Sequence, residues 1–329
     1  MKRRKLLGLV GGAVAWPLAT RGQKIDVRRV GVLMSGNEND PEVKAQVTAF
    51  LQRFAELGWS EGHNLRLEAR WGAGVDQIAT FARELVASQP DVILAASTPV
   101  AAALHRETQS IPVVFVVVSD PVGEGFVASL AHPGGNMTGF LHSESGMGAK
   151  MLQLLDQIAP GMKRVAALFN PDTAPGRGAY YFRDFEIAAR SFHIEPIAAP
   201  ARSDAEIETV ITSLGAQPGG GLFVVPDPFM FSREKTIVAL AARTSVPAIY
   251  PWKFAVTKDG GLLSYGPDLT DISRRSALYV DQVLRGVKPA DLPVQVPIKF
   301  EMAVNARTAK ALGLSVPLSI TLAADEVVD

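Results

Sequence analysis

The chain has 329 residues, of which 47% are apolar, with 33 basic and 33 acidic side chains and no cysteine. The lack of cysteine excludes disulfide bonds and thiolate chemistry. The apolar content is sufficient for one or two hydrophobic cores.

Basic residues at positions 2–5 precede an apolar stretch over residues 6–19, which is too short to span a bilayer. This pattern is typical of an export signal, and we expect residues 1–22 to be a signal peptide. The pair Arg3-Arg4 also permits twin-arginine export, so the Sec and Tat routes both stay open. A buried first helix or a membrane anchor is the alternative. Export predicts a periplasmic location for the mature protein.

The expected signal peptide contains five basic residues and no acidic one, so the remaining chain has 28 basic and 33 acidic side chains. This negative balance argues against a nucleic-acid partner, whose phosphates favour a basic surface. No later run of about eighteen apolar residues predicts a second membrane span. The histidines show no metal-site spacing, so we expect neither a metal nor a cofactor. We interpret each as a surface or turn residue: His63, His105, His132, His142 and His193.

Short apolar runs alternate with amphipathic stretches along the rest of the chain. The apolar runs predict strands at residues 29–34, 65–70, 92–96, 113–118, 165–169, 195–197 and 222–225. The amphipathic stretches predict helices at residues 41–57, 77–88, 100–108, 149–158, 179–192, 204–214 and 233–244. Strands that are apolar throughout have both faces covered, which indicates parallel sheets flanked by helices.

A cluster of turn formers at residues 132–136 separates two βα series of comparable size, which suggests two similar lobes. The tail is less regular, with a strand starting at 260–266, a helix at 271–285 and an extended stretch at 294–305. This tail can cross between the lobes more than once. The predicted fold class is α/β, with two Rossmann-like lobes that have parallel sheets and are hinged around a central cleft.

Small polar residues stand directly after the predicted strands, at the sheet edges that would face this cleft. Hydroxyls at a helix N-terminus bind carboxylates, and Ser97-Thr98 precedes a predicted helix. A carboxylate such as Asp120 or Asp227 would bind a ligand cation, so the combination suits a zwitterion. Helix capping and turn initiation are the plainer explanations of each residue alone.

Aromatic side chains fall in loops or at strand ends, where they can line a pocket or pack between the lobes; they are Phe229, Phe231, Tyr250, Trp252 and Tyr265. We take three of them as candidate lining residues. The candidate binding residues are Ser35, Ser97, Thr98, Asp120, Asn170, Asp227, Phe229, Tyr250 and Tyr265.

Several motifs are shared with a known family. They include Phe54-Ala55-Glu56-Leu57-Gly58-Trp59, Pro133-Gly134-Gly135-Asn136-Met137-Thr138-Gly139, Ser264-Tyr265-Gly266-Pro267-Asp268 and Lys288-Pro289-Ala290-Asp291-Leu292-Pro293. Through such segments the sequence resembles the substrate-binding proteins of ABC transporters of the tryptophan/tyrosine type, which are related in fold to the type I periplasmic binding proteins. The likeness extends over nearly the whole mature chain.

The resemblance implies two lobes joined by several crossings. The N-terminal lobe would hold residues 28–140 plus about 268–297, and the C-terminal lobe residues 141–267 plus about 298–329. The lobes would close on one small carboxylate-bearing molecule, an amino acid (aromatic ones included) or an organic acid. The protein would deliver it to an ABC permease with its cytoplasmic ATPase.

Carried over by position, Ser97-Thr98 would hold the ligand carboxylate and Asp227 would face an amino group. Tyr250 and Tyr265 would line the cleft near the hinge. Members of the family often have glycine at the position of Ser97, so the resemblance supports the transport role more than the ligand.

Two alternatives stay open beside a monomeric solute-binding protein without catalytic activity. One is a ligand-sensing binding protein that reports to a membrane receptor. The other is an exported α/β hydrolase with Asp120 and Asp227 as an acid/base pair. The chain has no Gly-x-Ser-x-Gly elbow and no Walker phosphate loop, which counts against an enzyme.

Overall fold

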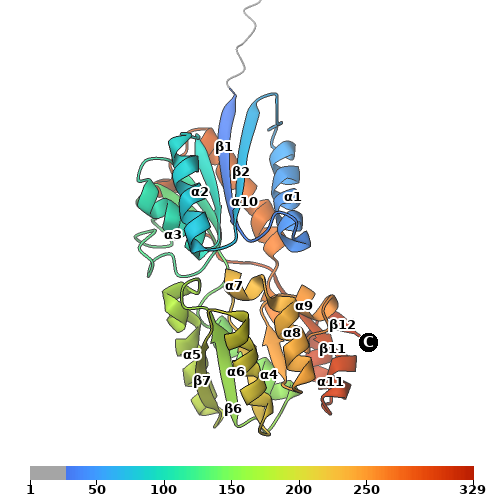
Figure 1. Cartoon of the computed structure of the whole chain (residues 1–329). Helices are drawn as coiled ribbons and strands as arrows, with labels where there is room; N and C mark the ends of the chain where they lie inside the picture. Colours follow the sequence, from blue (N-terminus) through green and yellow to red (C-terminus); the bar gives the residue numbers. More distant parts are fainter. Residues whose placement is uncertain (1–26) are drawn as a thin grey trace, which may run out of the picture.

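The computed structural model describes residues 27–329, which form two α/β lobes, one above the other in Figure 1. The expected signal peptide at residues 1–22 lies outside the described residues. Within residues 27–329, every helix is too short or too polar to cross a bilayer.

The N-terminal lobe is built on a five-stranded parallel sheet with the strand order β2-β1-β3-β4-β5. Its central strands are apolar along their whole length and buried, as a sheet covered on both faces requires. The strands are β1 (Arg28–Ser35), β2 (Leu65–Gly72), β3 (Val92–Ala96), β4 (Val113–Val118) and β5 (Met137–Leu141).

Two pairs of helices cover this sheet, α1 with α10 on one face and α2 with α3 on the other. The carboxylates of Asp40 and Asp268 each accept two backbone N–H groups and so begin α1 and α10. Although α1 and α10 are far apart in the sequence, they lie side by side, and Trp59 Nε1 donates to Asp281 Oδ1 at 2.9 Å. The helices are α1 (Pro41–Glu56), α2 (Val75–Ala87), α3 (Thr98–Glu107) and α10 (Leu269–Leu284).

The C-terminal lobe has a seven-stranded sheet with the order β12-β11-β10-β9-β8-β6-β7. Its strands pair in parallel except for β10 and β11, because the chain leaves the lobe after β10 and returns in β11 from the same end. The strands are β6 (Arg164–Phe169), β7 (Glu195–Pro200), β8 (Gly220–Val224), β9 (Ala248–Tyr250), β10 (Leu263–Pro267), β11 (Phe300–Asn305) and β12 (Glu326–Val328).

Helices again cover both faces of this sheet, with α4, α5, α11 and α12 on one side and α6 to α9 on the other. They are α4 (Met147–Ile158), α5 (Ala179–Ser191), α6 (Asp204–Gly215), α7 (Pro228–Phe231), α8 (Glu234–Arg243), α9 (Phe254–Thr257), α11 (Ala306–Ala311) and α12 (Leu318–Ala323), and single 3-10 turns lie at Pro175–Gly178 and Pro289–Asp291.

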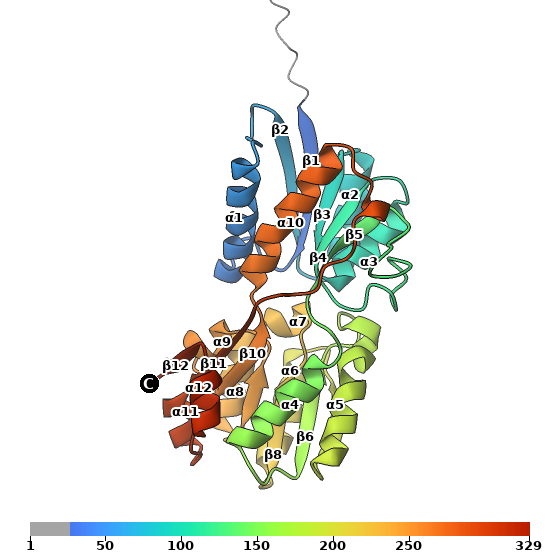
Figure 2. The ribbon, with the colours of Figure 1, turned by 180° about the vertical axis from the view of Figure 1, so that it is seen from behind.

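Three segments connect the lobes: the loop between β5 and α4, the turn between β10 and α10, and the extended strap before β11, which Figure 2 shows crossing from the upper lobe to the lower. The strap is held to β5, because Gln295 O accepts from Leu141 N at 2.8 Å and Gln295 N donates to Gly139 O at 2.9 Å. We propose that the lobes comprise residues 28–140 plus 268–297 and residues 141–267 plus 298–329, with these connections as the hinge.

Strand β5 was not predicted from the sequence, and it sits unusually close to β4. Gly139 has a φ of +155°, and a Cβ on it would lie 1.9 Å from the carbonyl oxygen of Phe115. The pairing register shifts between Phe115 and Val118, and Val117 adopts a φ of +56°. Such a bulge redirects side chains at the end of a strand. The residues that follow β4 and β5 thereby reach the space between the lobes.

Candidate functional site

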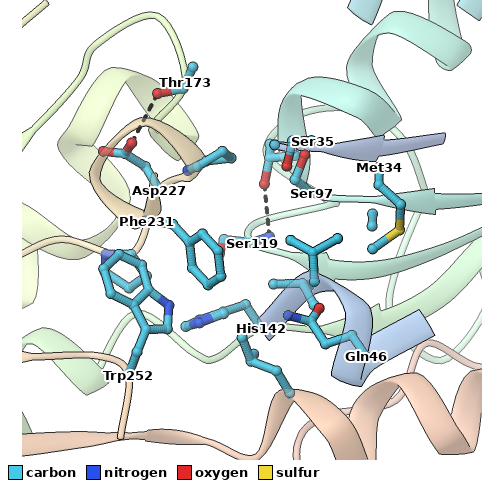
Figure 3. A pocket seen from close by; sticks show the side chains of 18 of the residues that line it. Met34, Ser35, Gln46, Ser97, Ser119, His142, Thr173, Asp227, Phe231 and Trp252 are labelled. Carbon is cyan, nitrogen blue, oxygen red and sulfur yellow. Dashed lines mark hydrogen bonds between the residues drawn. The ribbon is translucent and has the colours of Figure 1, made fainter. Parts of the chain in front are cut away.

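A cleft lies between the lobes, where the carboxyl ends of strands from both sheets meet. It holds about 660 Å³ of space free of protein atoms, part of it open to solvent. Figure 3 shows side chains from both lobes around it. The lining residues are Met34, Ser35, Gly36, Val43, Gln46, Ala96, Ser97, Thr98, Val117, Ser119, His142, Thr173, Pro175, Pro226, Asp227, Pro228, Phe231, Trp252 and Leu269.

Four candidate residues from the sequence line this cleft: Ser35, Ser97, Thr98 and Asp227. The first three belong to the N-terminal lobe, at the end of β1 and at the start of α3. Asp227 belongs to the C-terminal lobe and precedes α7. The rule that polar residues follow parallel strands therefore identifies residues of both lobes at one cleft.

Ser97 has a backbone that L-residues rarely adopt, with a φ of 99° and a ψ of 157°. The side chain is buried, and its Oγ has no hydrogen-bond partner among residues 27–329. Beside it, Thr98 Oγ1 accepts from Ser119 N at 3.1 Å. Strain of this kind often marks ligand-binding positions, and a buried hydroxyl without a partner is costly unless a ligand satisfies it.

The Asp227 carboxylate is only 4% exposed and accepts four hydrogen bonds. Its Oδ1 accepts from Thr173 Oγ1 at 3.0 Å and from the N–H groups of Phe229 and Met230 at 2.8 and 2.9 Å, while Oδ2 accepts from Asn170 N at 3.0 Å. Burial raises the pKa of this carboxyl to about 6 despite these hydrogen bonds. In the described part of the chain no basic side chain forms an ion pair with it.

Asp120 and Asn170 do not line the cleft, because each side chain is used within its own turn. Asp120 Oδ1 accepts from Gly123 N at 2.9 Å, and Asn170 Oδ1 accepts from Asp172 N at 2.8 Å. Asn170 still acts at the site indirectly through its backbone bond to the aspartate. The placement of Asp120 on its own turn gives no support to an acid/base pair.

The three candidate aromatic residues also lie outside the cleft lining. The Arg233 guanidinium covers the Phe229 ring at 3.6 Å from its centroid. Tyr250 is 1% exposed and packs in the core of the C-terminal lobe. Tyr265 stacks on Phe300, with ring centroids 5.5 Å apart.

Phe231 and Trp252 supply the aromatic surface of the cleft instead, and Figure 3 shows them on the same side as Asp227. Their rings meet edge to face, with centroids 5.2 Å apart and planes at 86°. In the short helix α7, Phe229 and Phe231 point in different directions, so the sequence alone could not separate lining from packing residues.

His142 corrects the interpretation of all histidines as surface or turn residues. It is 3% exposed and lines the cleft. Burial lowers the pKa of its imidazole to about 3, and no described residue forms a hydrogen bond with its Nε2. His142 directly follows β5, so recognition of that strand would have identified it by the same post-strand rule.

Further lining residues outside the candidate set are Gln46 on α1, Ser119 after β4, and Thr173, whose hydroxyl donates to the Asp227 carboxylate. No set of three His, Cys, Asp or Glu side chains within residues 27–329 is arranged to hold a metal ion. The cleft thus offers hydroxyls, an imidazole, a buried carboxylate, and apolar and aromatic surface.

Two α/β lobes linked by three segments around such a cleft define a bilobal solute-binding protein. The family model for the ABC transporter substrate binding protein matches residues 29–328, so the chain belongs to that family. Its role is accordingly to bind a solute for an ABC transporter.

Individual relatives agree with this assignment. The chain is 26% identical to the tyrosine-binding protein of Clostridioides difficile over 279 residues, which cover 83% of this chain and 78% of that protein. The crystal structure of an ABC domain from Streptococcus pneumoniae in complex with L-Trp is similar at 25% identity, with a TM-score of 0.82 over 92% of this chain and 100% of that one. A conserved domain protein from Vibrio cholerae has 25% identity and a TM-score of 0.83 over the same shares.

Proposed function

We propose that the cleft binds an α-amino acid, with the carboxylate at Ser97, Thr98 and His142 and the ammonium group at Asp227. The observation that carries this proposal concerns three buried groups around one cleft. Within the described part of the chain, the Asp227 carboxylate has no ion-pair partner, and Ser97 Oγ and His142 Nε2 have no hydrogen-bond partner. A buried charge requires a counter-charge, and a buried donor requires an acceptor. A zwitterion supplies both.

The ligand side chain is proposed to be apolar or aromatic. Phe231 and Trp252 present ring faces and edges to the cleft, and Met34 and Val43 add aliphatic surface from the N-terminal lobe. Aromatic pairs contribute beyond their buried area. L-tyrosine and L-tryptophan, which the names of two relatives contain, are therefore the first compounds to test.

The proposed transporter partner follows from the family, and the proposed location follows from the expected signal peptide. Substrate-binding proteins of this family hand a small molecule to a membrane permease. We propose that residues 1–22 direct export, that the mature protein acts outside the cytoplasm as a monomer without catalytic activity, and that the permease works with a cytoplasmic ATPase.

Calorimetric titration of the purified mature protein tests the ligand assignment. Asp227→Asn keeps an oxygen that can cap α7 but removes the charge, so it should weaken L-tyrosine or L-tryptophan about 30- to 1000-fold, as expected for an ammonium left unpaired in a closed site. Binding of the deaminated acid, 3-(4-hydroxyphenyl)propionate, should change much less. Equal affinity of wild type and variant for the amino acids, or no binding of either one, would contradict the proposal.

A further inference from the structure

Four buried polar side chains form a continuous hydrogen-bonded chain behind the cleft. Ser119 Oγ lies 2.7 Å from the hydroxyl oxygen of Tyr181, and that oxygen lies 2.7 Å from Ser143 Oγ. Ser143 Oγ in turn lies 3.0 Å from His142 Nδ1. All four residues are at most 3% exposed. Both ends of the chain, Ser119 and His142, line the cleft.

This hydrogen-bonded chain also joins the two lobes. Ser119 follows β4 of the N-terminal lobe, whereas Tyr181 belongs to α5 of the C-terminal lobe. Ser143 and His142 lie in the connection between β5 and α4. The Ser119 to Tyr181 contact is therefore made only while the lobes hold their present relative position.

Tyr181 Oη also lies 3.4 Å from His142 Nδ1, a longer contact than the other three. Along the three shorter contacts, counting protons leaves two arrangements of this hydrogen-bonded chain in which neither Tyr181 nor Ser143 has an unused proton. Burial keeps the imidazole neutral, so it carries one N–H, and each hydroxyl has one proton to donate. In the first arrangement Ser119 donates to Tyr181, Tyr181 to Ser143, and Ser143 to Nδ1, so the imidazole proton is on Nε2. In the second arrangement every donor is reversed: the proton is on Nδ1, Nε2 is a bare acceptor, and the Ser119 hydroxyl is free to donate.

We propose that this hydrogen-bonded chain contributes to ligand specificity, because the ligand selects one of its two concerted proton arrangements. The cleft thereby distinguishes a ligand atom that accepts a hydrogen bond at His142 from one that donates. An acceptor such as a carboxylate oxygen selects the first arrangement, with Nε2–H pointing to the ligand and Ser119 Oγ left as an acceptor. A donor at Nε2 selects the second. As far as the identity of the ligand is concerned, this inference rests on the proposed function, but the concerted chain itself does not.

A matched pair of substitutions at Ser119 tests the chain without any ligand. Ser119→Val has no hydroxyl, so the second arrangement would leave the Tyr181 hydroxyl without an acceptor, and the first should be favoured by roughly tenfold. Ser119→Thr has nearly the same shape and keeps the hydroxyl, so it should behave like wild type. Ser119→Ala, which is smaller, should shift the equilibrium in the same direction as valine and serves if valine disturbs folding.

The readout is the tautomer of His142, measured from the ¹⁵N shifts of its ring nitrogens and assigned through their loss in His142→Gln. We expect the Nε2–H form to increase in Ser119→Val and not in Ser119→Thr. In a Tyr181→Phe background the valine substitution should have no effect, because the connection is cut. An unchanged tautomer in both Ser119→Val and Ser119→Ala, or an equal change in the Tyr181→Phe background, would overturn the proposal.

Addition of L-tyrosine to the wild type forms the second arm, with calorimetry in parallel. A carboxylate at the imidazole should convert His142 fully to the Nε2–H form. Calorimetric binding with an unchanged tautomer would refute ligand selection while leaving the binding function intact. If calorimetry shows no binding of L-tyrosine, the assignment of the ligand is wrong. The Ser119 variants then still decide whether the hydrogen-bonded chain exists.

Discussion

At the scale of single residues, the site is defined by buried polar groups that lack a hydrogen-bond partner or a counter-charge from the described residues. Among the residues that the structure describes, Ser97 Oγ and His142 Nε2 are buried without a hydrogen-bond partner, and the Asp227 carboxylate is buried without a basic partner. Each of these arrangements costs free energy when no ligand is bound. A ligand that satisfies all three recovers this cost on binding, so affinity is concentrated in a few contacts.

Ser97 gives a prediction about stability, because its φ of +99° suits glycine. Relief of such strain contributes about 1–3 kcal/mol, and the greater freedom of glycine in the unfolded chain opposes it by about 0.5–1 kcal/mol. The free energy of unfolding of Ser97→Gly should therefore exceed that of Ser97→Ala, which also lacks Oγ but keeps Cβ, by about 1 kcal/mol, so Ser97→Gly should unfold at a higher urea concentration. Both variants should bind the amino acid more weakly than wild type. If Ser97→Gly is less stable than Ser97→Ala by the about 0.5–1 kcal/mol that the freedom of glycine costs, the backbone is not strained at this residue.

At the scale of elements, the sequence predicts those whose signal is local. The continuously apolar strands β3, β4 and β8 and the amphipathic helices α1 and α6 lie close to the expected ranges. Strand β5 is absent from the expected strands because it is short and contains Thr138 and Gly139. The close approach of Gly139 to β4 accompanies a bulge in β4, which the sequence of β5 does not encode. His142 was missed with it. Phe229 is covered by the Arg233 guanidinium and Phe231 lines the cleft, a difference that no local pattern encodes.

Helix α8 provides a prediction about pH. Glu234 is 3% exposed, and burial, with added contributions from Asp259 and from Glu42 and Asp40 of the other lobe, raises its pKa from 4.5 to about 9. The folded state therefore holds a proton that the unfolded chain releases above pH 4.5. The contribution of this group to stability is fully present below that pH and is lost as the pH rises toward 9, by up to about 1.4 kcal/mol per pH unit.

Glu234→Gln removes this titration, so the variant should gain stability over wild type between pH 5 and pH 8. The measurement is urea unfolding of both proteins at several pH values. Asp259→Asn should weaken the effect by removing the nearest carboxylate, whereas a change at exposed Lys258, which pairs with Glu42, should matter little. A stability difference between Glu234→Gln and wild type that is the same at pH 5 and pH 8 would show that Glu234 is ionised in the folded protein.

At the scale of the whole molecule, the site exists only because the chain crosses between lobes. The α/β class and the presence of two lobes follow from the alternation of apolar and amphipathic segments, since that pattern is local. The local pattern alone could not place the tail, because α10 packs on α1 and β11 pairs with β10 through contacts between distant segments. Its division between the two lobes was implied only by the family resemblance. The polar residues that follow the strands identify the edge of each sheet that faces the cleft. Whether the side chain of such a residue reaches the cleft depends on the conformation of its turn, as Asp120 and Asn170 show.

The measurement that tests the central claim most directly is a crystal structure of the mature protein grown with L-tyrosine. The account predicts one ligand molecule between the lobes, with its ammonium group within hydrogen-bond distance of Asp227 and its carboxylate beside Ser97 and His142. Its ring should lie against Phe231 and Trp252. A ligand bound outside this cleft, or bound in it with the carboxylate toward Asp227, would contradict the account.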